Sequence, residues 1–358
     1  MTTLKKITQK QLFLPLFSMV LVMLINMIYD VAHGNPFYNF FTISINSQGI
    51  LYGRLIDILN RGSEAAILAI GMTLVVSASA GTDISVGSVM SLAGGVCCVL
   101  LAGFGNVNVN SYAVPLWVGV LAGILTAGLC GAFNGFLVAF LKIQPMVATL
   151  ILFSAGRAIG LLLCNSAIVY FNVESFKMFG GYTWIFPTPL LITAGCVLVT
   201  ALALKFTALG TYVQAVGINK DAARISGYKS AAIIFLCYVV CGLFAGIAGI
   251  TATSRIYSAD TNNIGLNLEM DAILAVALGG NSLGGGKFRL SGSIIGAYTI
   301  QAITTTLYAL GVSSAQAPVF KAVIVIAIVT IQSPVVKAYM KKRKAAKQLE
   351  SGKEVHAS

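Results

Sequence analysis

The sequence predicts an all-α, polytopic helical membrane protein with about ten transmembrane segments, one of them short or broken. Hydrophobic residues make up 57% of the 358 residues and charged residues only 9%, whereas about 25% of the residues in an average soluble domain are charged. An apolar stretch of about 20 residues spans a bilayer core, and the chain contains many such stretches. This composition argues against a soluble enzyme, a disordered chain and a small disulfide-bonded scaffold.

Ten apolar stretches are the predicted membrane spans. The first runs from Phe13 to Tyr29, and because no small-residue cleavage pattern follows it, we interpret it as an uncleaved helix rather than a signal peptide. The others are residues 64–80, 84–104, 114–141, 145–164, 189–205, 230–254, 271–286, 290–310 and 319–337. The segment 271–286 is short and ends in three glycines, so we expect a broken or re-entrant helix there, which is tolerable where it lines protein or water.

The distribution of basic residues predicts the orientation of these spans. Ten spans place both termini on one side, and that side holds most of the 23 lysines and arginines. The exceptions are Arg54, Arg61, Arg157, Lys177, Arg255 and Lys321. Because cytoplasmic loops are enriched in Lys and Arg, both termini are predicted to be cytoplasmic, and we attribute the net charge of +12 to loop orientation rather than to nucleic-acid binding. This distribution supports an even number of spans rather than ten in particular.

Residues for enzymatic or metal chemistry are not evident in the sequence. The two histidines, His33 and His356, have no partners at catalytic or metal-ligand spacing, and the seven cysteines sit in apolar stretches without a Cys-x-x-Cys pair. Gly286-Lys287 is not part of a phosphate-binding loop, because Asn281 and Phe288 occupy positions that require Gly and Ser or Thr. We therefore predict no catalytic, cofactor-binding or metal-binding residues.

Five polar residues inside or beside the spans are candidates for a substrate pathway: Asp83, Asn134, Gln144, Arg157 and Asn281. A charged group at membrane depth is costly and is commonly retained for a partner or a pathway. For Asp83 the alternative is that it caps the helix that follows a tight cytoplasmic turn. For the others the alternative is hydrogen bonding between packed helices, with Arg157 requiring an anion, a carbonyl or water.

The longest predicted cytoplasmic loop, residues 206–229, contains a polar segment predicted to be helical over 219–226 and closed by Gly227. This segment is either a solvated connector or a docking element, and its small residues favour docking into a groove on another protein. The residues expected to contribute are Asn219, Asp221, Ala222, Ala223, Arg224 and Gly227.

Several motifs give the chain a specific resemblance to a known family. Residues 216–228 with 238–249 resemble the coupling loop of sugar-importing ATP-binding cassette permeases, the family of the bacterial ribose, xylose and galactose permeases. Residues 81–88, Gly-Thr-Asp-Ile-Ser-Val-Gly-Ser, resemble that family's Gly-Ile-Asp-Leu-Ser-Val-Gly-Ser signature. Further similar blocks are 134–135, 141–150, 268–276 and 279–286, and segments 53–61, 215–219 and 259–263 are most similar to the galactofuranose-type permease. Thr82 and Ala80 depart from the family pattern, where an aliphatic residue and a second Gly are usual.

This resemblance implies a permease subunit that moves a monosaccharide of the pentose, galactose or galactofuranose class by alternating access, driven by ATP hydrolysis on a partner chain. The implied partners are an ATP-binding cassette ATPase subunit, an extracytoplasmic sugar-binding protein, a second permease chain (identical or a sister permease) and membrane lipid, with no nucleic acid. The implied location is the bacterial cytoplasmic (inner) membrane. The expected domains are tails over 1–11 and 338–358 and a transmembrane permease domain over 12–337.

Three other functions remain open from the residues themselves. An ion-coupled secondary transporter needs buried carboxylates, for which Asp83 is the best candidate. A branched-chain amino-acid permease would have a similar architecture. A membrane-embedded enzyme is disfavoured because no clustered acid, base or metal site can be assembled from the sequence.

Overall fold

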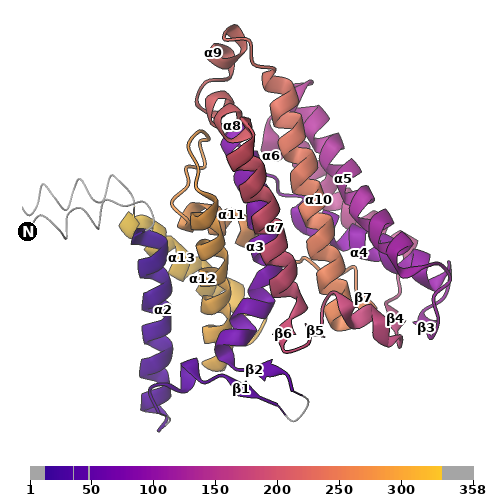
Figure 1. The fold of residues 1–358 in the computed structure, drawn as a ribbon, viewed down its shortest axis with the longest axis vertical. Helices are drawn as coiled ribbons and strands as arrows, with labels where there is room; N and C mark the ends of the chain where they lie inside the picture. Colours follow the sequence, from indigo (N-terminus) through magenta and orange to yellow (C-terminus); the bar gives the residue numbers. More distant parts are fainter. Residues whose placement is uncertain (1–12, 35, 47–48, 333–358) are drawn as a thin grey trace, which may run out of the picture. The chain divides into compact units, whose positions relative to one another are not determined.

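The computed structural model describes residues 13–34, 36–46 and 49–332, so the predicted tails over 1–11 and 338–358 lie outside the described residues. The described residues divide into two compact units, one up to Thr306 and one from Leu307 on. Ten of the described helices coincide with the ten predicted spans (Figure 1). They are α2 (Phe13–Ala32), α3 (Arg54–Ser79), α4 (Val86–Ala102), α5 (Leu116–Ala139), α6 (Pro145–Leu163), α7 (Thr188–Phe206), α10 (Ser230–Ile256), α11 (Leu268–Leu278), α12 (Leu290–Ala309) and α13 (Ala317–Gln332).

Six of these helices, α2, α3, α5, α6, α7 and α10, are long and apolar enough to cross a membrane. This supports a multi-pass membrane protein. The α11 helix, with 11 residues, is shorter than a bilayer-spanning helix, and α4, with 17, is at the lower limit of that length. The span count of ten and the sidedness of the termini therefore stay predictions.

Two helices differ in extent from the predicted spans. The α3 helix begins at Arg54, ten residues before the predicted span, directly after Gly53, whose φ is 150°. The α11 helix ends at Leu278 rather than at Gly284 to Gly286. Gly280 has a φ of 78°, and a Cβ added at Gly279 would collide with the backbone of Gly292. The chain therefore leaves the helix at the first glycine pair, where it packs against α12.

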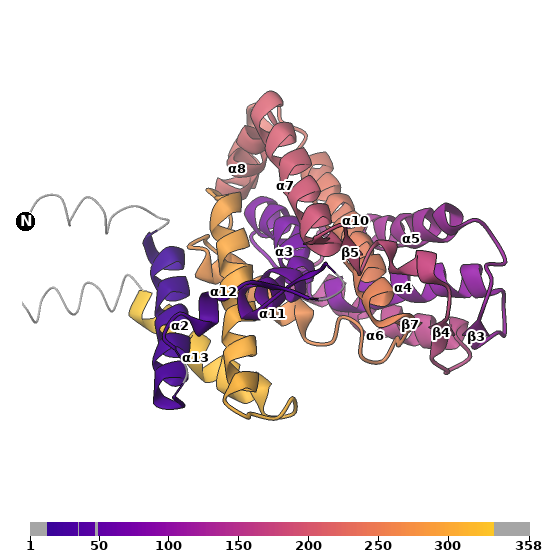
Figure 2. The same cartoon turned by 60° about the horizontal axis from the view of Figure 1, so that its bottom comes forward.

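Helices α3, α4 and α10 form the core of the larger unit. Nearly the whole length of α4 and the second half of α3 are buried, and α10 packs against α3, α4 and α5. Figure 2 shows α4, α5 and α6 together on one side of α10, with α3 on its other side. A Cβ at Gly242 of α10 would collide with the α5 backbone at Ala127 and Gly131, so the glycines allow these helix backbones to approach closely.

The outer helices present apolar side chains at their surface. Leu121, Leu125 and Leu129 follow one another at intervals of one helical turn on α5 and are all exposed. Large exposed apolar residues also occur on α6 and α7, for example Leu162 and Val199. An exposed apolar band of this extent is unusual in a soluble monomer and suits contact with lipid.

The short strands all lie at one end of the larger unit, here called the strand end, and two short helices lie at the opposite end (Figure 1). The strands are β1 (Ser44–Ile45), β2 (Leu51–Tyr52), β3 (Asn108–Val109), β4 (Val169–Phe171), β5 (Tyr182–Thr183), β6 (Phe186–Pro187) and β7 (Ser258–Ala259), with 3-10 helices η1 (Asn39–Phe41) and η2 (Glu174–Met178). The β4 strand pairs in parallel with β3, with Tyr170 opposite Asn108, and antiparallel with β7, with Val169 opposite Ala259. This sheet ties together three loops that are distant in the sequence.

The opposite end, here called the α9 end, carries α8 (Leu209–Ile218) and α9 (Lys220–Ile225) between α7 and α10. Chain direction places the α3–α4 and α5–α6 linkers at this end as well, and the cavity described below joins them to α8 and α9.

Candidate functional site

The α9 helix corresponds to the short helix that the sequence predicts over 219–226. Asn219 is its N-cap: the side-chain Oδ1 accepts hydrogen bonds from the backbone N–H of Asp221 at 3.1 Å and of Ala222 at 2.9 Å. At the other end Gly227 has a φ of +89°, Tyr228 N donates to Ala223 O and Gly227 N donates to Arg224 O, both at 3.0 Å. These bonds form a Schellman motif, which ends the helix sharply.

The outer surface of α9 differs from the surface expected from the sequence. Ala223 is buried against its own chain, with 5% of its surface exposed. It therefore packs α9 against the rest of the protein and has little surface left for a partner, and its role in docking stays a prediction. Ala222, Arg224 and Asp221 are exposed, as is Ile225, at 84%. Ile225 was not singled out from the sequence, because a single isoleucine after a run of polar residues gives no signal about which side of a short helix it occupies.

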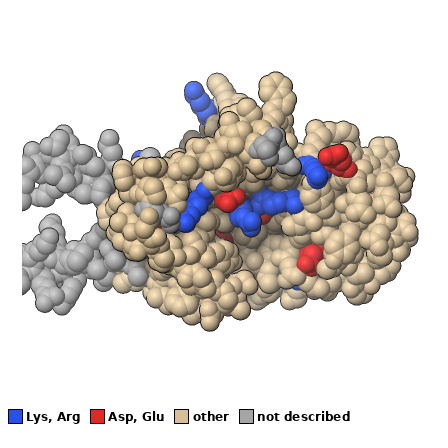
Figure 3. Space-filling view, turned by 90° about the horizontal axis from the view of Figure 1, so that it is seen from below, with Lys and Arg blue, Asp and Glu red and all other residues tan. Residues whose placement is uncertain are grey.

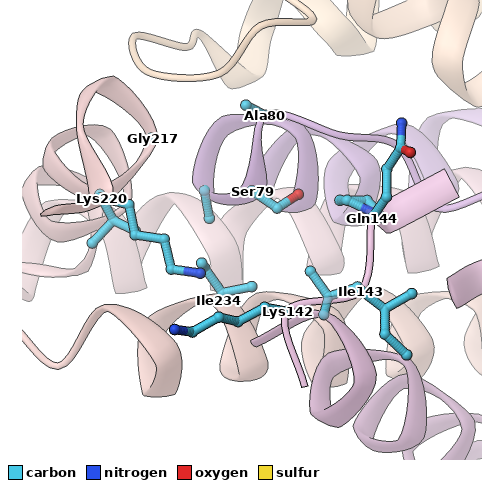
Figure 4. A pocket seen from close by; sticks show the side chains of 12 residues that line it. Ser79, Ala80, Lys142, Ile143, Gln144, Gly217, Lys220 and Ile234 are labelled. Carbon is cyan, nitrogen blue, oxygen red and sulfur yellow. The ribbon is translucent and has the colours of Figure 1, made fainter. Parts of the chain in front are cut away.

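A cavity of about 370 Å³ lies at the α9 end. It is bounded by the C-terminal residues of α3, the linker between α5 and α6, the end of α8 and the first residue of α9. Lys142 and Lys220 contribute their side chains from two different elements and extend toward the same end of the cavity, beside Ile234 (Figure 4). Gln144, a candidate pathway residue, also lines this cavity.

Asp83 lies in the linker between α3 and α4 and is buried. Its Oδ1 accepts hydrogen bonds from the Ser85 backbone N–H at 2.9 Å and from the Ser85 hydroxyl at 2.6 Å, and Asn134 Nδ2 donates to the same hydroxyl at 2.8 Å. Burial raises the pKa of Asp83, and the hydrogen bonds from Ser85 and Asn134 act in the opposite direction. Asp83 therefore forms a turn with Ser85, the N-cap residue of α4, and Ser85 links this turn to Asn134 of α5.

Arg157 of α6 binds the loop between β7 and α11. Its Nη1 lies within hydrogen-bonding distance of three backbone carbonyls, those of Thr261 at 2.8 Å, Asn262 at 2.7 Å and Ile264 at 3.0 Å. Carbonyl partners were one of the three possibilities expected for this guanidinium. The arrangement fixes the path of the loop at the strand end.

Asn281 connects the two ends of the loop between α11 and α12. Its Oδ1 accepts from Arg289 N at 2.7 Å, and its Nδ2 donates to Ser293 Oγ at 2.7 Å. The five candidate pathway residues therefore do not converge: Asp83 and Asn134 share one cluster, and Gln144, Arg157 and Asn281 lie at three other places.

A second cavity, of about 300 Å³, lies at the strand end. It is lined by Arg61 and Glu64 of α3, Arg255 of α10, and Asn263 and Ile264 of the loop that Arg157 holds. Figure 3 shows basic side chains gathered around a hollow on this face, with acidic side chains among them. We call this cavity the charged cleft. Sequence reasoning used Arg61 and Arg255 only to assign orientation and did not single out Glu64, because positions far apart in the chain give no sign of meeting.

Within the described part of the chain, no group of three or more His, Cys, Asp or Glu side chains lies together as metal ligands would. The seven cysteines are free thiols, and all but Cys130 are buried.

The fold and these sites define a polytopic membrane protein with a polar cavity toward each end of its larger unit. Residues 54–331 match the family described as branched-chain amino acid transport system / permease component. The chain therefore belongs to this family of permease components and is a transport subunit rather than an enzyme.

Curated relatives give the comparison more detail. The chain is 44% identical over 287 residues to the galactofuranose transporter permease of Escherichia coli (strain K12), covering 80% of this chain and 81% of the relative. It is 37% identical to the fructose import permease of Bifidobacterium longum, covering 96% and 94% of the two chains, and 36% identical to the ribose import permease of Escherichia coli (strain K12), covering 87% and 92%.

Proposed function

We propose that this chain is the membrane permease of an ATP-binding cassette importer that carries a monosaccharide into the cytoplasm. The relatives named for a substrate are permeases for galactofuranose, fructose, ribose and L-arabinose. These relatives favour a sugar over a branched-chain amino acid as the substrate. In the charged cleft, Arg61, Glu64 and Arg255 offer hydrogen bonds to the hydroxyl groups of a sugar.

In this proposal the α9 end faces the cytoplasm and the strand end faces outward, in a bacterial inner membrane. The charge distribution along the chain supports this orientation. In a cysteine-free version, Lys177→Cys is expected to react with an impermeant thiol reagent added outside, whereas Lys142→Cys is expected to stay unlabelled until the membrane is opened. External labelling at position 142 would reverse the orientation.

The observation that carries the proposed coupling role is the exposed Ile225 on a helix fixed at both ends. An isoleucine with 84% of its surface exposed, outside the apolar helices, suits insertion into a groove on a partner protein. In this family's division of labour the partner is the ATPase subunit, with a second permease chain and an extracytoplasmic binding protein completing the importer. ATP-driven movement of the ATPase subunits would pass through α9 and alternate access to the pathway.

The test uses the complete importer in proteoliposomes. Ile225→Glu is expected to lower ATP-driven sugar uptake at least tenfold and to weaken ATPase binding, because it places a charge in the docking groove. Ile225→Leu is the matched control and is expected to keep near-normal uptake, since it preserves the apolar surface. A panel of galactofuranose, galactose, fructose, ribose and L-arabinose identifies the substrate. Normal uptake by Ile225→Glu would refute the docking role, and uptake of none of the sugars would refute the sugar assignment.

A further inference from the structure

The charged cleft contains an ion pair whose hydrogen-bonding capacity is only partly used. Glu64 is 9% exposed, and its Oε1 lies 3.4 Å from Arg255 Nη2 without forming a hydrogen bond. Arg255 Nη2 donates instead to the backbone oxygen of Asn60 at 2.8 Å and to its Oδ1 at 3.2 Å. Among the described residues, Glu64 Oε1 and Arg255 Nε have no hydrogen-bond partner.

Buried polar atoms without partners are rare, because leaving them unpaired costs free energy. In this case both atoms belong to residues that line one cavity of about 300 Å³, the lower limit of the usual volume of small-molecule sites. Arg61 stands exposed at the same cavity and adds a second guanidinium. Apolar side chains complete the lining: Met90, Ile264 and Leu268.

We propose that Glu64 and Arg255 form a sugar subsite, in which the carboxylate accepts a hydrogen bond from one hydroxyl of the monosaccharide and the guanidinium donates to a neighbouring one. A sugar hydroxyl is both donor and acceptor, so one polyol in the cleft can bind both the carboxylate and the guanidinium. The apolar lining residues would contact the C–H face of the ring. Asn60 and the helices α3 and α10 hold the pair in place, which keeps the site preformed.

The subsite rests on the proposed function for the nature of its ligand, and it assigns residues that the proposed function does not need. The alternative is that the pair only ties α3 to α10. The two are distinguishable because a structural tie affects every sugar equally, whereas a subsite senses the hydroxyl it binds.

The experiment measures initial rates of ATP-driven uptake by the complete importer, at varied concentrations of sugar-loaded binding protein. The substrates are the transported sugar and its singly deoxygenated analogues, and the variants are Glu64→Gln, Arg61→Gln and Asp30→Asn. Asp30 forms a second buried ion pair, with Arg54 at 2.8 Å, and does not line the cleft. Its variant is the matched control for the loss of a buried carboxylate.

We expect Glu64→Gln to lower kcat/KM for the natural sugar about tenfold or more, and Asp30→Asn to change it less than twofold. For one deoxy analogue, kcat/KM with the wild type should be lower than for the natural sugar by a similar factor. Combining this analogue with Glu64→Gln should lower kcat/KM little further, because the two changes remove the same contact. If Glu64→Gln does not assemble, Arg61→Gln, at the exposed rim, is expected to show the same non-additivity with a neighbouring analogue.

If the losses from the substitution and from deoxygenation add up for every analogue, the subsite is refuted. This holds for Glu64→Gln or, where that variant does not assemble, for Arg61→Gln. The proposal that the chain belongs to a sugar importer would be unaffected. Failure of the wild type to transport any sugar would overturn both. Equal losses from Glu64→Gln and Asp30→Asn with all sugars would identify the pair as a structural tie.

Discussion

Removing the N-cap of α9 is the most direct way to test whether a rigid helix is needed for coupling. Asn219→Ala deletes the one side-chain oxygen that accepts from both Asp221 N and Ala222 N. Replacing an Asn cap by Ala costs about 1 kcal/mol, and a helix of six residues has little stability of its own. A cost of about 1 kcal/mol lowers the ratio of closed to open helix about fivefold.

Hydrogen exchange of the backbone amides in 221–226 measures this ratio, with the importer in lipid nanodiscs. Asn219→Ala should speed exchange about fivefold, Asn219→Gly should have a smaller effect, and Asn219→Asp should match the wild type because the acceptor is kept. Sugar-stimulated ATP hydrolysis should fall in the same order. Unchanged exchange in Asn219→Ala, or an Asp variant as poor as the Ala variant, would show that the cap does not hold α9.

Three further predictions follow from residues near the linkers. Ala80→Gly should raise the free energy of unfolding by about 0.5–1 kcal/mol, because Ala80 has a φ of 53°; thermal unfolding in detergent measures it, and a lower Tm would contradict it. Asp83→Asn should fold and transport normally since an acceptor remains, whereas Asp83→Ala should cost about 1–3 kcal/mol; lost transport by a well-folded Asn variant would instead assign the charge to the pathway. Arg157→Gln should lower the free energy of unfolding by about 1.5–3 kcal/mol and make the 260–267 loop sensitive to protease. If the loop stays resistant to protease, Arg157 does not hold it in place.

The fold class was predictable because it depends on composition and on apolar stretches, which are local properties. All ten predicted stretches coincide with helices. The start of α3 was missed because Arg54, Asp57 and Arg61 interrupt the apolar residues there, and hydropathy does not report helices that continue beyond an apolar stretch. The resemblance to the permease family was confirmed by the family match over residues 54–331.

The site residues were predictable only in part. Asn219 and Gly227 act within a few residues of themselves, and their roles as cap and helix stop follow from local chemistry. The burial of Ala223 depends on tertiary packing, which the local sequence does not reveal. Glu64 and Arg255 lie almost 200 residues apart in the chain, so their contact could not be predicted from one sequence either. The family's usual Gly at position 80 has a physical reason here, because the backbone there is left-handed.

The small sheet at the strand end has a mechanical consequence. By pairing β3, β4 and β7, it joins the loops that connect α4 to α5, α6 to α7, and α10 to α11 through backbone hydrogen bonds. The three fastened loops cannot separate without breaking that ladder. Among the described residues, no strand joins the loops at the α9 end. The backbone ladder therefore resists separation of the loops at the strand end alone.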